Sequence, residues 1–396
     1  MTSFLKKFAV VCLALGAVQT STASANTLAW TQHQNPQTST NDITAAFRNP
    51  AGMSFMDPGF YFNFTGQVIW LDRQSTATEL TGPYAGNHYG PKLTGFAPYV
   101  SAGWTGERWS FFGFTHVYSG SPDAVSFDPA LLDLSVAGLG WQEAKLDVIS
   151  AIFTYNLGVS YKVTDTLAVS FVSALATRID DVEVEFKNVP GTAAGEGLGT
   201  TVGLQVGAAY KPNDDWFFSL GGKSPIKVKS YINLESLQEQ SGDLGALASG
   251  IAVDTINDTI EIPWKLSGGA RYSLKPDWSV SGSFLLEFWD VTEEKVRRNL
   301  YAVAVGTEVQ VTDMLDLSAG AGVATPDTKP GYITPNNPPT PGFTFSGGAG
   351  LSFLDNHKLD VGATLSTREN WDTPNQGFVD AKAMTLLLSM GYTLHI

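Results

Sequence analysis

The residues best suited to binding chemistry are five basic side chains within strand-like segments. They are Arg178, Lys223, Lys227, Lys265 and Arg271. A charge-assisted hydrogen bond to a carboxylate is stronger than a neutral one, so these residues are candidates for holding an anionic headgroup. In the alternative interpretation, they pair with acids in the same kind of segment, such as Glu261, Glu287 and Glu308, or with the predicted N-terminal plug.

The sequence contains no recognisable catalytic constellation. Its five histidines are scattered without the spacing of metal ligands, and there is no Gly-x-Ser-x-Gly elbow and no phosphate-binding loop. Cys12 is the only cysteine, which excludes a disulfide framework and a thiolate metal site. We therefore predict a protein that is not an enzyme and that uses no metal and no cofactor.

Two long connections are unusually apolar and are predicted to form an exposed ligand-binding surface. The first, over 127–141, contains Leu131, Leu132, Leu134, Leu139 and Trp141. The second, over 232–253, contains Leu234, Leu237, Leu244 and Leu247. Exposed apolar patches usually mark binding sites. Alternatively, the two connections pack on each other as a small core.

Fourteen strand-like runs follow residue 58 and must position these side chains. The runs are 59–73, 94–104, 108–118, 146–162, 165–179, 199–211, 215–230, 261–274, 277–290, 299–311, 314–324, 342–354, 357–368 and 382–395. The connections between them alternate in length. The long ones lie near 74–93, 119–145, 180–198, 232–260, 325–341 and 369–381. Short periplasmic turns and long outer loops are typical of a transmembrane β-barrel.

Alternation within the runs supports a barrel. In 261–274 we assign Ile262, Trp264 and Leu266 to one face and the charged residues Glu261 and Lys265 to the other. A lysine or arginine facing lipid at the bilayer midplane costs about 2–4 kcal/mol, so the polar face should line the lumen. A soluble β-protein also alternates, but it does not explain the alternating connection lengths.

The N-terminal residues predict export. Residues 1–25 read as a signal peptide, with Lys6 and Lys7 before an apolar stretch and a small-residue cleavage site at Ala23-Ser24-Ala25. Residues 26–58 are polar and read as an N-terminal plug, and 59–396 as the barrel. The predicted location is the outer membrane of a Gram-negative bacterium. The net charge of −14 argues against nucleic acid as a partner and fits solvated outer loops.

The segment Asn49-Pro50-Ala51-Gly52-Met53, just before the first run, resembles the N-terminal signature of the long-chain fatty-acid transporter (FadL) family. The resemblance extends through glycine-bearing strands over nearly the whole predicted mature chain. It implies a fourteen-stranded barrel with an N-terminal hatch, and uptake of long-chain fatty acids or aromatic hydrocarbons with sideways release into the membrane. Two departures are a shorter leader before Asn49 and a final residue, Ile396, that is not aromatic.

The plug is the predicted gating element. Asp42 and Arg48 are expected to tie it to the wall, and Asn49, Pro50 and Ala51 to set the turn into the first strand, with the Asn49 side chain bonding nearby backbone. Gly113, in an otherwise bulky third strand, marks a candidate site for a lateral opening.

These observations predict a monomeric channel for passive uptake of hydrophobic compounds, with long-chain fatty acids as the leading cargo. The alternatives are an aromatic-hydrocarbon channel, a general diffusion porin for small hydrophilic solutes, and a structural or adhesin-like barrel. The predicted partners are hydrophobic small molecules, outer-membrane lipid and lipopolysaccharide, and the barrel-assembly machinery.

Overall fold

The computed structural model describes residues 43–77, 88–89, 92–133, 141–186, 192–235, 255–292, 297–327, 329, 342–354, 356–369 and 378–396. The predicted signal peptide, the first part of the predicted plug with Asp42, and the loop residues Leu134, Leu139, Leu237, Leu244 and Leu247 lie outside these ranges.

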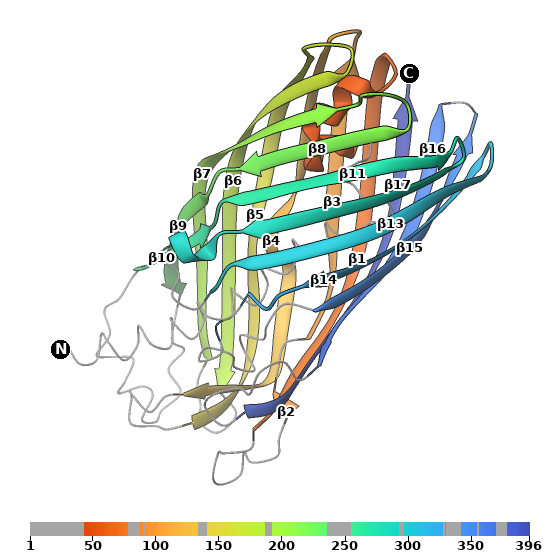
Figure 1. Cartoon of the computed structure of the whole chain (residues 1–396). Coiled ribbons are helices and arrows are strands. Elements are labelled where there is room, and N and C mark those ends of the chain that lie inside the picture. The colour runs from red at the N-terminus through yellow and green to blue at the C-terminus, as the bar shows by residue number, and fades with distance from the viewer. Residues whose placement is uncertain are drawn as a thin grey trace.

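The described strands form one closed antiparallel sheet (Figure 1). They are β1 (Gly59–Ala77), β2 (His88–Tyr89), β3 (Lys92–Thr105), β4 (Trp109–Asp133), β5 (Trp141–Lys162), β6 (Leu167–Phe186), β7 (Thr192–Tyr210), β8 (Trp216–Lys223), β9 (Ile226–Glu235), β10 (Thr255–Ile262), β11 (Lys265–Lys275), β12 (Trp278–Glu287), β13 (Leu300–Thr312), β14 (Leu315–Ala324), β15 (Phe343–Phe353), β16 (His357–Glu369) and β17 (Phe378–His395). No helix among the described residues is long and apolar enough to cross a bilayer.

In these ranges the wall consists of fourteen strands, because β8 with β9 and β10 with β11 are halves of single crossings and β2 is a short outer pairing on β1. Each predicted run overlaps one wall strand. The barrel closes where β1 pairs with β17, as in Tyr61 opposite His395. The backbone bonds between Phe60 and Ile396 bring the chain end to the same rim as the short turns. The predicted fourteen-stranded barrel is therefore confirmed.

The two faces of the wall differ as a membrane barrel requires. Large apolar side chains such as Leu157, Val202 and Met390 are exposed on the outside. Buried polar side chains such as Thr154 and Gln205 line the inside. This alternation lets lipid contact apolar groups while the lumen remains polar.

Several segments predicted as loops continue as strands. The prediction of a loop over 119–145 was wrong for most of its length, because β4 extends to Asp133 and β5 begins at Trp141. Similarly, β6 extends to Phe186, and β7 begins at Thr192. The reason is that an outer hairpin can continue its backbone ladder beyond the membrane, where no apolar face is required.

The predicted face assignment in 261–274 was also wrong in part. Ile262 is 3% exposed and Lys265 is 8% exposed, and both point into the barrel, whereas Trp264 is 53% exposed. The strand is interrupted at Pro263-Trp264, so the residues before and after the break do not keep one alternation. Proline lacks the N–H that a continuous ladder requires.

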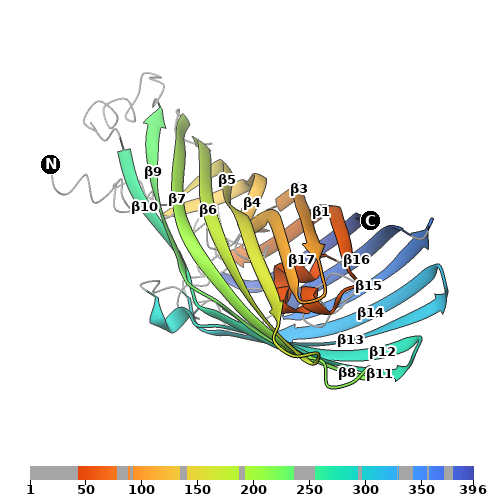
Figure 2. The ribbon, with the colours of Figure 1, turned by 90° about the horizontal axis from the view of Figure 1, so that it is seen from above.

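A folded N-terminal segment lies inside the barrel (Figure 2). It consists of the short helix α3 (Ala45–Arg48) and the 3-10 helix η2 (Pro50–Phe55). Ile43, Ala46 and Met53 are fully buried against inward side chains that include Phe112 and Val172. Ser54 and Ser160 are joined by a hydrogen bond of 2.5 Å between their hydroxyl oxygens. We call residues 43–56 the plug segment.

Candidate functional site

The plug segment places two functional side chains in the lumen. The turn from α3 to η2 is held by backbone bonds, from Asn49 N to Ala45 O and from Gly52 N to Asn49 O, each 2.8 Å. Pro50 occupies the first position of η2, where its missing N–H costs nothing. This turn fixes Phe47 and Arg48 at the end of α3.

Phe47 lies in an aromatic group contributed by the plug segment and two wall strands. Its ring centroid is 6.0 Å from that of Tyr99, 6.0 Å from that of Phe114 and 4.3 Å from that of His116. His116 is held by Thr154, whose Oγ1 lies 3.1 Å from His116 Nδ1. Edge-to-face contacts of this kind suit aromatic rings, and they leave an apolar lining beside the plug segment.

Basic side chains gather next to this aromatic group. Lys223 Nζ donates to the Phe47 carbonyl at 3.4 Å and lies 4.6 Å from the Phe47 ring centroid. Lys265 stands opposite Lys223 in the β8–β11 ladder. Arg48 is 6% exposed and is within electrostatic reach of both Lys223 and His116. We call Arg48, Lys223 and Lys265 the lumen cation cluster.

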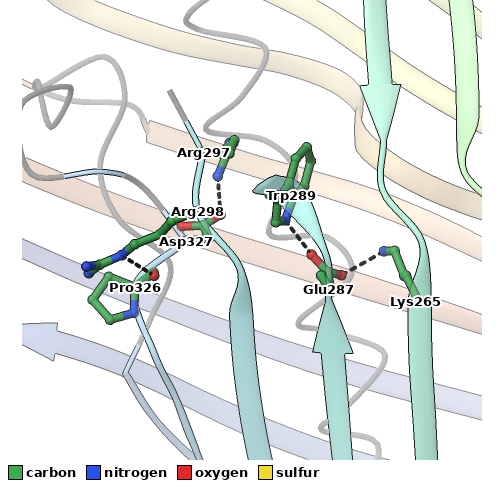
Figure 3. A network of polar contacts seen from close by, with 7 residues as sticks. All are labelled: Lys265, Glu287, Trp289, Arg297, Arg298, Pro326 and Asp327. Carbon is green, nitrogen blue, oxygen red and sulfur yellow. Dashed lines mark hydrogen bonds and ion pairs between the residues drawn. The ribbon is translucent and has the colours of Figure 1, made fainter. Parts of the chain in front are cut away.

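A polar network links this cluster to the outer end of the wall (Figure 3). Lys265 Nζ lies 2.8 Å from Glu287 Oε1, and Trp289 Nε1 donates to Glu287 Oε2 at 3.0 Å. The Arg297 guanidinium carbon lies 5.4 Å from the Trp289 ring centroid, and Arg297 forms an ion pair with Asp327. The sequence pattern predicted Lys265 and Glu287 as lumen residues. It missed Trp289 and Arg297, because they lie just beyond the end of β12 and just before the start of β13, where alternation no longer applies.

The other predicted cations lie elsewhere. Arg178 is fully buried in an ion pair with Asp180, with Nε and Oδ2 2.8 Å apart. Lys227 is exposed on β9, on the face opposite Val228. Arg271 lies with its guanidinium carbon 5.9 Å from the Phe217 ring centroid. Of the five candidates, the structure thus brings Lys223 and Lys265 together and adds Arg48 from the plug segment.

The predicted apolar loop residues occupy strand ends where they are described. Leu131 and Leu132 lie in the outer part of β4, Trp141 begins β5, and Leu234 lies near the end of β9. Their role as an extracellular collecting surface remains a prediction.

The prediction for the Asn49 side chain was wrong. It is 2% exposed, and neither its Oδ1 nor its Nδ2 has a hydrogen-bond partner among the described residues. The turn is formed by the backbone alone, so this asparagine does not stabilise it in the way the sequence suggested. Phe47 was missed altogether, because a single phenylalanine in a polar leader gives no pattern.

The arrangement combines apolar rings with basic side chains. The aromatic group can pack against an apolar tail, and the cluster can hold an anionic group through charge-assisted bonds. Among the residues that the structure describes, no group of three or more His, Cys, Asp or Glu side chains is placed to hold a metal ion.

No family model and no curated protein matches the sequence. Solved structures match the fold. The toluene transporter TodX of P. putida gives a TM-score of 0.64 at 14% identity, covering 91% of this chain and 96% of that one. A Pseudomonas aeruginosa FadL homologue gives 0.63 at 17%, covering 89% and 94%. The Ralstonia pickettii toluene transporter TbuX gives 0.62 at 12%, covering 89% and 93%.

The coverage of both chains is nearly complete in each of these matches. The chain therefore shares the overall fold of the TodX, TbuX and FadL-homologue structures.

Proposed function

We propose that the protein is a passive channel of the Gram-negative outer membrane that takes up hydrophobic compounds, with long-chain fatty acids as its cargo, and that it belongs to the FadL family. The lumen cation cluster carries this proposal, because Arg48 and Lys223, next to Lys265 in its ion pair with Glu287 and beside the aromatic group, suit a carboxylate headgroup attached to an apolar chain. A hydrocarbon without a charged group would gain nothing from them.

The filled lumen argues against a general diffusion porin. The buried plug segment occupies the space that a porin leaves open for water. A purely structural barrel would not require basic residues held inside it at the cost of desolvation.

A route for sideways release is supported by the β3–β4 seam. The ladder pairs Tyr99 with His116, and the next pair outward is Lys92 with Ser126. Between these pairs β4 carries three extra residues relative to β3, which interrupts the ladder between the two strands. Gly113, the predicted marker, lies in the regular part of the ladder opposite Ala102, so the seam is nearer the outer end than the sequence suggested.

Monoaromatic hydrocarbons are the second candidate cargo. The aromatic group of Phe47, Tyr99 and Phe114 suits a flat apolar ring. The likeness in fold to transporters of toluene also favours this candidate.

Uptake of radiolabelled oleate and toluene by cells with and without the gene tests the proposal. We expect an oleate deficit that the intact gene restores. A deficit in toluene alone would favour the second candidate. No deficit in either, with slower entry of small sugars instead, would overturn the proposal in favour of a porin.

Replacing Lys223 by methionine should weaken oleate binding by about 10–100-fold, because a hydrogen bond to a charged group contributes about 1.5–3 kcal/mol. Methionine keeps most of the length and the apolar stem. Equilibrium binding of labelled oleate to the purified protein measures the effect, and toluene transport should be unchanged.

Lys229→Met is the matched control, since Lys229 is exposed on β9 away from the cluster. Equal oleate affinity in the Lys223→Met variant and the control would show that the cluster does not bind the headgroup. Each variant is confirmed as folded by comparing heated and unheated samples on a detergent gel, because a folded barrel stays compact in detergent until it is heated.

A further inference from the structure

Two neighbouring wall strands are interrupted at the same height. Ser224-Pro225 separates β8 from β9, and Pro263-Trp264 separates β10 from β11. Lys223 faces Lys265 just below the breaks, and Ile226 faces Ile262 just above them. Proline donates no backbone hydrogen bond, so ladder hydrogen bonds are missing at the same height in both strands. We call this level the line of the breaks.

Above this line, the first part of β9 bends over the inner face of β7 before it rejoins the β7 ladder. β7 pairs with β8 over 205–210 and with β9 over 194–198, and no ladder pair joins β7 to β9 between these stretches. A Cβ added to Gly199 would lie 2.1 Å from the Lys229 carbonyl oxygen. One added to Gly203 would lie 3.1 Å from Ile226 Cγ1. Glycine here permits the close backbone approach.

Strands β9 and β10 are held by apolar contacts against the inner face of the nearby strands β5 and β6. Ile226 and Val228 of β9 and Ile262 of β10 form one buried cluster with Ile152 of β5 and Ala176 of β6. These side-chain contacts join β9 and β10 to strands to which they are not hydrogen-bonded in the described ranges. We call the hairpin of β9 and β10 the flap.

The outward face of the flap differs from that of the strand below it. Below the break, Trp216, Phe218 and Leu220 are exposed on the outside. Above it, Lys227 and Lys229 are exposed. Since a lysine facing the hydrocarbon costs about 2–4 kcal/mol at the midplane, this part of β9 does not present an apolar face to lipid as β8 does.

We propose that the flap is a second gate, separate from the plug segment, which turns about the two proline breaks. Hydrophobic cargo passes between its apolar face and the inner side of β5 and β6 on its way to Lys223 and Lys265. The apolar part of the cargo replaces the contacts of Ile226 and Val228, so opening exposes little apolar surface to water. This inference rests on the proposed uptake function.

A reversible disulfide between the flap and the wall tests the gate. In a disulfide, each Cβ lies about 3 Å from the partner sulfur, close to the spacing between a Cβ at position 203 and Ile226 Cγ1. The double variant Gly203→Cys/Ile226→Cys needs no other change, because Cys12 is the only native cysteine and lies in the predicted signal peptide. We expect oxidation to lower oleate uptake at least about tenfold, and reduction to restore it.

The matched control is Ser283→Cys/Ala304→Cys, a facing pair in the regular β12–β13 ladder. It should cross-link without affecting uptake. Equal uptake by the oxidised and reduced flap variant, with the cross-link verified by mass, would overturn the proposal. Failure of the unmodified protein to transport oleate or toluene would instead count against the proposed function.

A second variant tests the flap without any cargo. Gly199→Ala forces the Lys229 carbonyl away, whereas Gly222→Ala meets its nearest atom at 3.8 Å. The thiol of Ile226→Cys, at a site 3% exposed, should react with maleimide faster in the Gly199→Ala background than in the Gly222→Ala background. Equal labelling rates would show that the flap does not move as a unit, whatever the cargo.

Discussion

Replacing Asp180 by leucine should lower the free energy of unfolding by about 3–5 kcal/mol, the largest loss expected from any single substitution in the wall. Asp180 and Arg178 point to the same face of β6, and neither side chain is exposed. The Ser150 hydroxyl also donates to Asp180 Oδ1 at 2.8 Å. Removing the carboxylate leaves a guanidinium in a place from which water is excluded.

The double variant Arg178→Met/Asp180→Leu should recover most of this loss, because an apolar pair of similar volume carries no desolvation penalty. Unfolding by urea from phospholipid vesicles, followed by tryptophan fluorescence, measures each variant. If the Asp180→Leu variant unfolds at the same urea concentration as the unmodified protein, the pair is not a stabilising element of the barrel.

The same spacing in β5 supplies the control. Lys145 and Asp147 are also two residues apart, with Nζ and Oδ2 2.7 Å apart, but their side chains are 44% and 24% exposed. Solvent screening limits such pairs to about 1 kcal/mol or less. Asp147→Leu should therefore change the stability little. The contrast isolates burial as the cause of the large effect.

The barrel itself could be predicted because the membrane imposes a strong pattern. Lipid requires apolar and polar residues to alternate on every crossing, and short turns lie at one end of the barrel and long connections at the other. These two patterns were enough to predict fourteen runs that each overlap a wall strand. The pattern failed beyond the membrane. From Ser126 to Asp133, the β4 ladder continues without any lipid-facing requirement, so the sequence there looked like a loop.

The site could be predicted only where it follows the wall. Lys223 and Lys265 share the lumen face of adjacent strands, so alternation found them both. Phe47 and Arg48 reach the cluster through the fold of the plug segment, which has no periodicity. The proline breaks at Pro225 and Pro263 were visible in the sequence, but their consequence depends on the two being at the same height, which only the register shows.

Deleting residues 43–56 should widen the aqueous path through the lumen, raising the single-channel conductance in a planar bilayer on the order of tenfold while the flap remains in place. The wall is closed by β1–β17 pairing and does not depend on the plug segment for its hydrogen bonds. The deletion should therefore leave a folded barrel, but it removes Phe47 and Arg48 from the site. Oleate binding should be lost together with the rise in conductance.

Ser54→Ala is the graded control, since it removes only the contact to Ser160 and should cost about 1 kcal/mol of plug attachment. A deletion variant that folds but conducts no better than the full chain would show that the plug segment does not limit the conductance. Closure would then fall to the flap alone. Adding Gly199→Ala to the deletion distinguishes these cases: two gates in series predict a further rise in conductance, whereas a single gate at the plug segment predicts none.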